Sequence, residues 1–237
     1  MPDLTLAAFN SHYGLCAPPH PPRTPYDVPA AIRRLAADII VIEELWRPDG
    51  VHGIVDDVAA ELGLDLVYEQ TGRATAIKRW PHITPRGEGS VGIAVLSALP
   101  MRRVGAIRLG PTPGDPAPNR TALHVEVTVE GEPLQVIAVH LTSRLPFGPP
   151  LQLRRLAGAI PEDGAAVVAG DCNFWGFGVR AFMRRWKRAV RGRTWPARHP
   201  HSQIDHVLVR PWMHVRASEV LPDLGSDHRP VRAAIGW

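Results

Sequence analysis

Short apolar runs recur along the chain and alternate with stretches rich in Gly, Pro, Asn and Asp. Runs of this length, bounded by turn-forming residues, predict strands. We expect strands at residues 4–9, 38–43, 65–70, 91–96, 103–108, 121–129, 134–140, 165–169, 204–209, 215–220 and 231–235. Apolar residues at helical spacing predict helices at residues 28–37, 53–62, 151–160 and 179–190. Pro, Gly and charged residues predict loops at residues 16–25, 71–90 and 110–119.

The order and character of these elements indicate the fold class. Residues 39–42 (IIVI) are apolar at every position, as in a strand that is buried on both faces. Strand-rich stretches are interrupted by a few helices, with no internal repeat and no linker. This pattern favours one α/β (α+β) domain with mixed sheets over residues 1–237, a length that can bury a large core.

Polar residues stand at or beside the ends of several apolar runs. They are Asn10, Glu44, His140, Asp171, Asn173, Asp205, Asp227 and His228. One such residue alone is commonly a cap or a turn former. A carboxylate, carboxamide or imidazole at so many strand ends indicates instead a metal site that cuts phosphoesters, so we interpret the protein as a hydrolase.

Spacing within the segments suggests how these residues pair. Asp171 and Asn173 in GDCN are two positions apart, so an extended backbone would place both side chains on the same side. In IDHV and SDHR an Asp precedes a His, and neighbours in an extended chain face opposite ways. We therefore expect Asp205 to hold His228 while Asp227 faces a metal ion. An imidazole held by a carboxylate can move protons near neutral pH.

Glu44 follows the buried strand, where a carboxylate is costly unless it meets a cation. Its neighbour Glu43 should point the opposite way and be a satisfied polar residue rather than a ligand. Oxygen ligands without a Cys pair favour Mg²⁺, or Mn²⁺, over Zn²⁺. Such an ion would polarise a phosphoryl group and offset the charge that develops during in-line attack.

Composition narrows the cellular context. The protein has a net charge of +4 and a pI of about 9.6. A basic protein of this kind would tolerate a polyanionic substrate better than an acidic protein would. The two cysteines, Cys16 and Cys172, offer neither a disulfide framework nor metal-ligand spacing. No basic and apolar leader precedes the first strand, and no apolar run is long enough to cross a bilayer. We therefore expect a cytoplasmic protein with no membrane partner and no obligate protein partner.

Taken together, these motifs resemble the endonuclease/exonuclease/phosphatase superfamily, which has the deoxyribonuclease I-like fold, over essentially the whole chain. The matching segments are residues 42–44 (IEE), 92–97 (GIAVLS), 120 (Arg), 170–173 (GDCN), 205–206 (DH) and 226–228 (SDH). Glu43 stands where the family usually has Gln, and Arg120 matches a common family arginine.

The resemblance implies a four-layer sandwich, with two mostly antiparallel mixed β-sheets face to face, helices outside and a Mg²⁺-dependent site at one edge. By family roles, Asn10 and Glu44 hold the metal, with Asp227 close to it. Asp171 positions or deprotonates the attacking water. By the same family roles, the residues that contact the substrate phosphate are Asn10, Arg120, Asn173 and His140. Asp205 and His228 act as the acid/base pair.

The substrate class stays open at this point. A phosphodiester of nucleic acid, DNA or RNA, is our first expectation. A phosphomonoesterase or small-molecule phosphodiesterase on the same scaffold is the alternative. A catalytically inactive binding module is disfavoured, because every motif position keeps a chemically competent residue.

The segment after GDCN has further candidate features. A helix at 179–190 would gather Arg180, Arg184, Lys187 and Arg188 on one face, with Arg191 added if it runs one residue further. Such a face is commonly solvated, but it could also contact a phosphate backbone.

Aromatic and histidine residues near the motifs have two interpretations each. Trp175, Trp186 and Trp195 could stack on bases, although Trp186 is the one favoured for the core. His199, His201 and His206 could form a metal tract, but their spacings fit no common zinc pattern.

Overall fold

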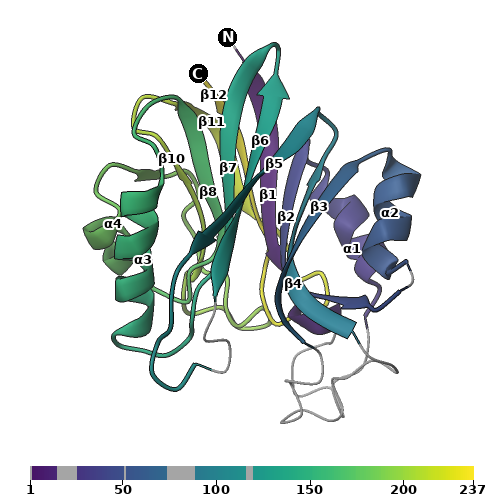
Figure 1. The fold of residues 1–237 in the computed structure, drawn as a ribbon, viewed down its shortest axis with the longest axis horizontal. Helices are drawn as coiled ribbons and strands as arrows, with labels where there is room; N and C mark the ends of the chain where they lie inside the picture. Colours follow the sequence, from purple (N-terminus) through teal and green to yellow (C-terminus); the bar gives the residue numbers. More distant parts are fainter. Residues whose placement is uncertain (1, 15–25, 51, 74–88, 116–119) are drawn as a thin grey trace.

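The computed structural model of the protein describes residues 2–14, 26–50, 52–73, 89–115 and 120–237, and its strands form two six-stranded sheets (Figure 1). The first sheet has the order β11-β12-β1-β2-β4-β3. Its strands are β1 (Asp3–Asn10), β2 (Ile39–Pro48), β3 (Asp65–Arg73), β4 (Gly89–Ser97), β11 (His214–Val220) and β12 (Val231–Gly236). Only β1 and β2 run parallel in it, as in a mixed sheet.

The second sheet has the order β5-β6-β7-β8-β10-β9. Its strands are β5 (Met101–Arg108), β6 (Thr121–Val129), β7 (Glu132–His140), β8 (Ala165–Asp171), β9 (Lys187–Arg188) and β10 (Asp205–Val209). Strands β7 and β8 are its parallel pair, and the other pairings are antiparallel.

The two sheets pack face to face and helices cover their outer faces, so the molecule has four layers (Figure 1). The alternation within β2 shows how the sequence builds them: Ile39 and Val41 enter the core between the sheets, whereas Ile40 and Ile42 face the helices. Helices α1 (Val28–Leu35) and α2 (Ile54–Leu62) cover the first sheet. Helices α3 (Gly148–Ala159) and α4 (Gly176–Phe182) cover the second.

Strand direction brings the predicted site residues to one edge of the sandwich, the lower edge in Figure 1. Strands β1, β2, β7 and β8 end there, and the antiparallel strands β10 and β12 begin there. Across the second sheet, Asp171 pairs directly with both His140 and Asp205. Residues far apart in sequence therefore meet because the topology places their strand ends together.

Most predicted elements are present with shifts of a few residues, and the helix predicted at 179–190 is the clear error. Helix α4 ends at Phe182, and Lys187 and Arg188 form β9 against β10. The chain turns at Met183 and buries Met183 and Trp186 in the core beneath α4. Backbone pairing with the exposed edge of β10 and burial of these two side chains outweigh a continued helical turn.

Some sequence predictions fall outside the described residues. These are Cys16, the Pro-rich loop at 16–25, most of the loop at 71–90 and the end of the loop at 110–119. Cys172 is a buried free thiol. Among the helices that the structure describes, none is long and apolar enough to cross a bilayer.

Candidate active site

The strand ends surround one pocket of about 690 Å³ at this edge. Of the residues predicted from sequence, Glu44, Arg120, His140, Asp171, Asn173, Asp227 and His228 line it. Asn10 and Asp205 lie directly behind this lining, because Asn10 bonds Glu44 and Asp171 while Asp205 bonds His228. All nine predicted residues are therefore at one site, although they come from both sheets and the loop before β12.

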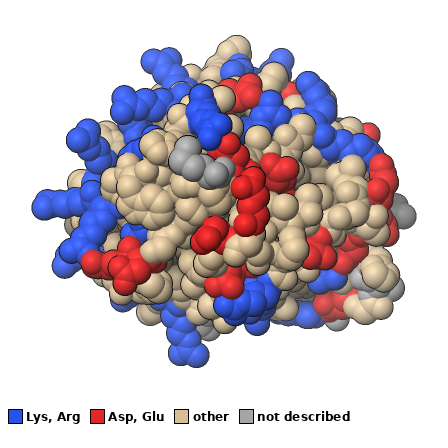
Figure 2. All heavy atoms as spheres, turned by 90° about the horizontal axis from the view of Figure 1, so that it is seen from above, with Lys and Arg blue, Asp and Glu red and all other residues tan. Residues whose placement is uncertain are grey.

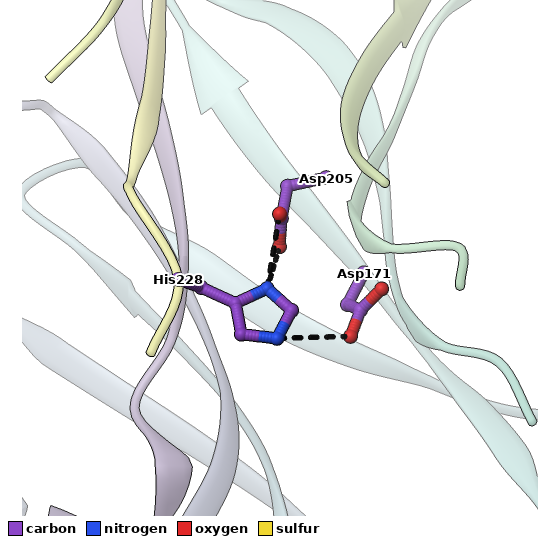
Figure 3. A group of neighbouring side chains, drawn as sticks. All are labelled: Asp171, Asp205 and His228. Atoms are coloured by element: carbon purple, nitrogen blue, oxygen red, sulfur yellow. Dashed lines mark hydrogen bonds and ion pairs between the residues drawn. The ribbon is translucent and has the colours of Figure 1, made fainter. Parts of the chain in front are cut away.

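His228 lies between two buried carboxylates (Figure 3). Its Nδ1 is 3.0 Å from each carboxylate oxygen of Asp205, and its Nε2 is 3.9 Å from Asp171 Oδ2. Burial alone would lower the pKa of His228, but the charges of Asp205 and Asp171 outweigh it and raise the pKa well above its usual value. His228 is therefore an imidazolium near neutral pH, held by Asp205 as the sequence predicted.

Asp171 and Asn173 come together by a turn rather than by an extended strand. Strand β8 ends at Asp171, and Asn173 has a left-handed φ of 46°. Asp171 Oδ1 accepts a hydrogen bond from the backbone N–H of Asn173 at 2.7 Å, which closes the turn. Asn173 Nδ2 then donates to Asp171 Oδ2 at 3.3 Å and to the carbonyl of Leu141 at 2.9 Å. The two side chains share the site as expected, but the extended geometry assumed for them was wrong.

The glycine of this motif is required by close packing beneath the site. Gly170 has a φ of 132°, and a Cβ added there would lie 2.1 Å from the carbonyl oxygen of Val139. The same Cβ would lie 2.5 Å from Glu43 Oε1, so the Glu43 carboxyl group rests against the Gly170 backbone.

Glu43 itself departs from the sequence prediction. It is completely buried, and neither carboxylate oxygen has a hydrogen-bond partner among the described residues. Burial, followed by the charges of Asp205 and Asp171, raises the pKa of Glu43 well above its usual value. The prediction that Glu43 has hydrogen-bond partners was wrong, because its side chain is buried against the Gly170 backbone.

A β-bulge in β2 directs Glu44 into the pocket. The pairing of β2 with β4 shifts between Ile42 and Leu45, and Glu44 has a φ of 50°. Ser11 secures the bulge, because its hydroxyl donates to the carbonyls of Glu43 and Glu44 at 2.9 and 3.1 Å.

Asn10 links the two carboxylates that face the pocket. Its Nδ2 donates to Asp171 Oδ2 at 3.1 Å and to Glu44 Oε1 at 3.3 Å. Its Oδ1 accepts from the backbone N–H of His12 at 3.0 Å. In this arrangement Asn10 orients Glu44 and Asp171 through its amide donors.

His140 completes this side of the pocket. Its Nε2 lies 3.6 Å from Glu44 Oε1 and 3.8 Å from Asp171 Oδ2. Burial, with the nearby charge of Arg120, lowers the pKa of His140 well below its usual value, so the ring is neutral at neutral pH. Arg120 donates to the carbonyl of His140 at 3.2 Å and pairs with Asp115 at 2.7 Å. Arg120 thus borders the pocket and also fixes the backbone of His140.

Two pocket residues, His12 and Tyr13, escaped the sequence interpretation. They form the short 3₁₀ turn after β1, and both have positive φ. His12 Nδ1 lies 3.7 Å from Asp227 Oδ1, and burial together with the charge of Glu44 raises the pKa of Tyr13. The NSHYG segment directly after the first strand could have signalled them, because a polar turn at a strand end faces the same edge.

Carboxylates exceed cations in the pocket. Burial is the main cause that raises the pKa of Glu44, and it raises the pKa of Asp171 to about 7. The cations nearest to them are already engaged, His228 by Asp205 and Arg120 by Asp115. An oxygen-rich, anionic and buried donor set fits a hard divalent cation. Asp171, Asp205 and His228 form a candidate metal site, with ligand atoms that all lie within 4.8 Å of one another.

Some of the tryptophans and histidines singled out from the sequence lie at the pocket, and others lie in the core. Trp175 and Trp195 border the pocket, whereas Trp186 is buried under α4, as favoured. The histidine tract does not assemble: His206 Nε2 bonds the carbonyl of Phe174 at 3.0 Å, and the His201 ring packs on Trp195. Burial lowers the pKa of His206 to about 4.

Comparisons with known proteins agree with this fold. Residues 7–228 match the model of the Endonuclease/Exonuclease/phosphatase family. The chain belongs to this family and is a phosphoester hydrolase by fold and by its buried candidate metal site. No curated protein sequence matches it.

Solved structures with the same fold include proteins of different activities. An endonuclease/exonuclease/phosphatase from Beutenbergia cavernae is 23% identical with a TM-score of 0.73, over 100% of this chain and 72% of the other. A mannosyl-6-phosphatase from Bacteroides thetaiotaomicron is 15% identical with a TM-score of 0.67, over 99% of this chain and 100% of the other. TDP2 from D. rerio, complexed with a single strand DNA product, is 14% identical with a TM-score of 0.65, over 99% of each chain. At these identities the likeness concerns the fold.

Proposed function

We propose that this protein is a Mg²⁺-dependent phosphodiesterase that hydrolyses nucleic acid, with Mn²⁺ as an effective substitute. The convergence of Glu44, Asp171 and the Asp205–His228 pair on one anionic pocket carries the proposal. A phosphodiester is itself anionic, so these carboxylates would repel it unless a cation intervened. A divalent ion bound between the carboxylates and the phosphodiester would remove this repulsion.

Glu44 and Asp171 are the residues best suited to hold the ion, with Asp227 beside them. Asp205 already binds His228 Nδ1, and the raised pKa of His228 keeps a proton on the ring that would have to leave before the ring bound a metal. Glu44 and Asp171 instead share the amide of Asn10 and face open pocket. When bound, the ion would polarise the phosphoryl oxygen and offset its developing charge.

The protein groups divide the proton transfers between them. The Asp171 carboxylate is suited to accept the proton of the attacking water. In the metal-free protein burial raises its pKa to about 7. The His228 imidazolium is suited to protonate the leaving oxygen, while Asp205 holds the ring in place. Neutral His140 can donate a hydrogen bond to a phosphoryl oxygen, and Arg120 keeps His140 in position. Asn173 can donate a second one if its Nδ2 gives up the 3.3 Å bond to Asp171.

Features around the pocket support a nucleic-acid substrate. Trp175 and Trp195 offer aromatic surfaces at its rim, where a base could stack. The overall positive charge favours a polyanion. The DNA complex of the similarly folded TDP2 is consistent with this substrate class.

The direct test is hydrolysis of labelled DNA and RNA oligonucleotides in Mg²⁺ by the wild type and by Asp171→Ala. The proposal expects internal or terminal phosphodiester cleavage by the wild type that falls by orders of magnitude in the variant. Release of inorganic phosphate from phosphomonoesters, with no cleavage of any oligonucleotide, would reject it. That result would favour the phosphomonoesterase alternative, an activity found on this fold in the Bacteroides mannosyl-6-phosphatase.

A further inference from the structure

A second cavity, of about 410 Å³, lies beside α4 on the outer face of the second sheet. Val179, Met183, Trp186 and Leu208 give it an apolar floor. Its other lining consists mainly of five basic side chains: Arg180, Arg184, Lys187, Arg188 and Arg191. These are the cations that the sequence had assigned to one long helix. The turn at Met183 and strand β9 instead fold them around a concave surface.

The positive charge of this basic cavity is not balanced within the described part of the chain. None of its five basic residues forms an ion pair with a described carboxylate, whereas the neighbouring Arg185, which does not line the cavity, pairs with Glu162. Arg188 is partly buried, and burial together with the charges of Arg191 and Arg180 lowers its pKa. Mutual repulsion of this kind is costly without an anion, so the cavity is suited to bind one.

The basic cavity adjoins the active-site pocket through the start of α4. Trp175 borders the pocket, and the next residue, Gly176, lies under Arg188, because a Cβ there would fall 1.7 Å from Arg188 Nη1. Arg188 also donates to Gln203 Oε1 at 3.1 Å, beside the pocket residue Ile204. In Figure 2, viewed from the opposite end of the molecule, Lys and Arg side chains project along the margin on which α3 and α4 lie.

An exposed aromatic pair lies at the same junction. The rings of Trp175 and Phe177 are parallel within 3°, with centroids 6.1 Å apart. Phe177 is 76% exposed, and Trp175, which also contacts the Phe174 ring, is 42% exposed, so part of the pair remains in water. Exposed parallel aromatics beside a cationic groove are the elements with which proteins bind unpaired bases and their phosphates.

We propose that single-stranded nucleic acid binds from the active-site pocket, across Trp175 and Phe177, into the basic cavity, where its backbone phosphates contact Arg180, Arg184 and Arg188. This inference rests on the proposed nuclease function and adds the strand type and a binding subsite. The concave form of the cavity suits a narrow strand better than a flat bilayer surface. A duplex would keep its bases stacked and leave the aromatic pair without a partner.

The first experiment measures binding without turnover, using labelled oligothymidylate in EDTA. Arg180→Glu should weaken binding at least about tenfold, and Arg180→Glu/Arg184→Glu should reduce the slope of log K against log salt by about 0.7 per lost phosphate contact. Arg34→Glu is the matched control, since Arg34 is exposed on α1 at the opposite outer layer and carries the same change in charge. Equal affinity of Arg180→Glu and Arg34→Glu would overturn the inference.

The second experiment separates this inference from the proposed function. Hydrolysis of bis(p-nitrophenyl) phosphate in Mg²⁺ should be unchanged in Arg180→Glu/Arg184→Glu and in Phe177→Ala, while both lose oligothymidylate affinity. If the wild type cleaves no nucleic acid but its oligonucleotide binding still depends on Arg180, the function fails and the subsite stands. Tighter binding of a duplex than of oligothymidylate would overturn the single-strand assignment. It would also be overturned if the Arg180 and Arg184 substitutions weakened binding to phosphatidylserine vesicles but not to oligothymidylate.

Discussion

His228 Nδ1 lies 3.0 Å from both oxygens of Asp205, and both residues are almost completely buried. Asp205 begins β10 of the second sheet, whereas His228 lies in the loop that leads into β12 of the first. Their contact therefore fixes the relation between the sheets at the pocket and keeps the ring protonated. The first prediction follows from this contact.

Asp205→Asn should reduce kcat by about 10²–10⁴ on a phosphodiester substrate, because the ring loses the charge that keeps it an imidazolium. Removing a carboxylate from a histidine lowers the histidine pKa. The alkaline limb of the pH–rate profile, which reports loss of this proton, should therefore move to lower pH. Asp57→Asn, at an exposed position on α2, is the control. An unmoved limb would exclude His228 as the acid.

Glu44→Gln should raise the Mg²⁺ concentration required for half-maximal activity by on the order of tenfold, since ligand charge sets the affinity of such sites. Activity of the wild type should vanish in EDTA and return with Mg²⁺ or Mn²⁺. A Mg²⁺ titration of initial rates measures the shift, with Glu132→Gln at the far end of β7 as control. Turnover that persists in EDTA would contradict the metal requirement itself.

Glu43→Gln should stabilise the metal-free protein above about pH 5. The folded protein holds the Glu43 proton more tightly than the unfolded chain, whose value is near 4.5. Glu43 therefore favours folding at low pH, and this contribution is lost as the pH rises through the folded pKa. A Gln cannot ionise, so its advantage should grow with pH.

Thermal unfolding of Glu43→Gln and wild type in EDTA, at pH 4 and pH 8, checks the sign. Each kcal/mol gained shifts the Tm of a domain of this size by roughly 2–4 °C. The difference should be small at pH 4 and largest at pH 8. A Tm advantage that shrinks toward pH 8 would show that the Glu43 carboxylate is stabilised by groups other than those around it in this structure.

His140→Ala should lower kcat more than it raises KM, because a hydrogen bond to a phosphoryl oxygen gains strength as negative charge develops there. Steady-state kinetics in saturating Mg²⁺ separates the two constants. His52→Ala, an exposed histidine before α2, serves as the comparison. If KM rises while kcat is unchanged, His140 contributes to substrate binding alone.

Local signals in the sequence predicted most strands and eight of the nine site residues, whereas the layer order and Arg120 came from the family resemblance. The run IIVI showed burial on both faces of β2, and the polar residues at strand ends marked a common edge. The Asp205–His228 contact followed from the alternation of adjacent side chains. These features depend on periodicity over a few residues, which sequence records directly.

The errors concern features that only tertiary packing decides. The apolar spacing from Val179 to Trp186 fits a helix, yet Met183 and Trp186 bury themselves through a turn and the following residues pair with β10. The left-handed backbone at Glu44 has no signature in its residue type, whereas Asn, as at Asn173, adopts this conformation more often than most residues. The unpaired burial of Glu43 depends on Gly170, which is distant in sequence.

The position of the bound divalent ion tests the central claim most directly. Crystals grown with Mn²⁺ would locate the ion by its anomalous scattering, without reference to any assumed substrate. The account predicts a peak within bonding distance of carboxylate oxygens of both Glu44 and Asp171. A fully active enzyme whose ion lies outside this pocket would contradict it.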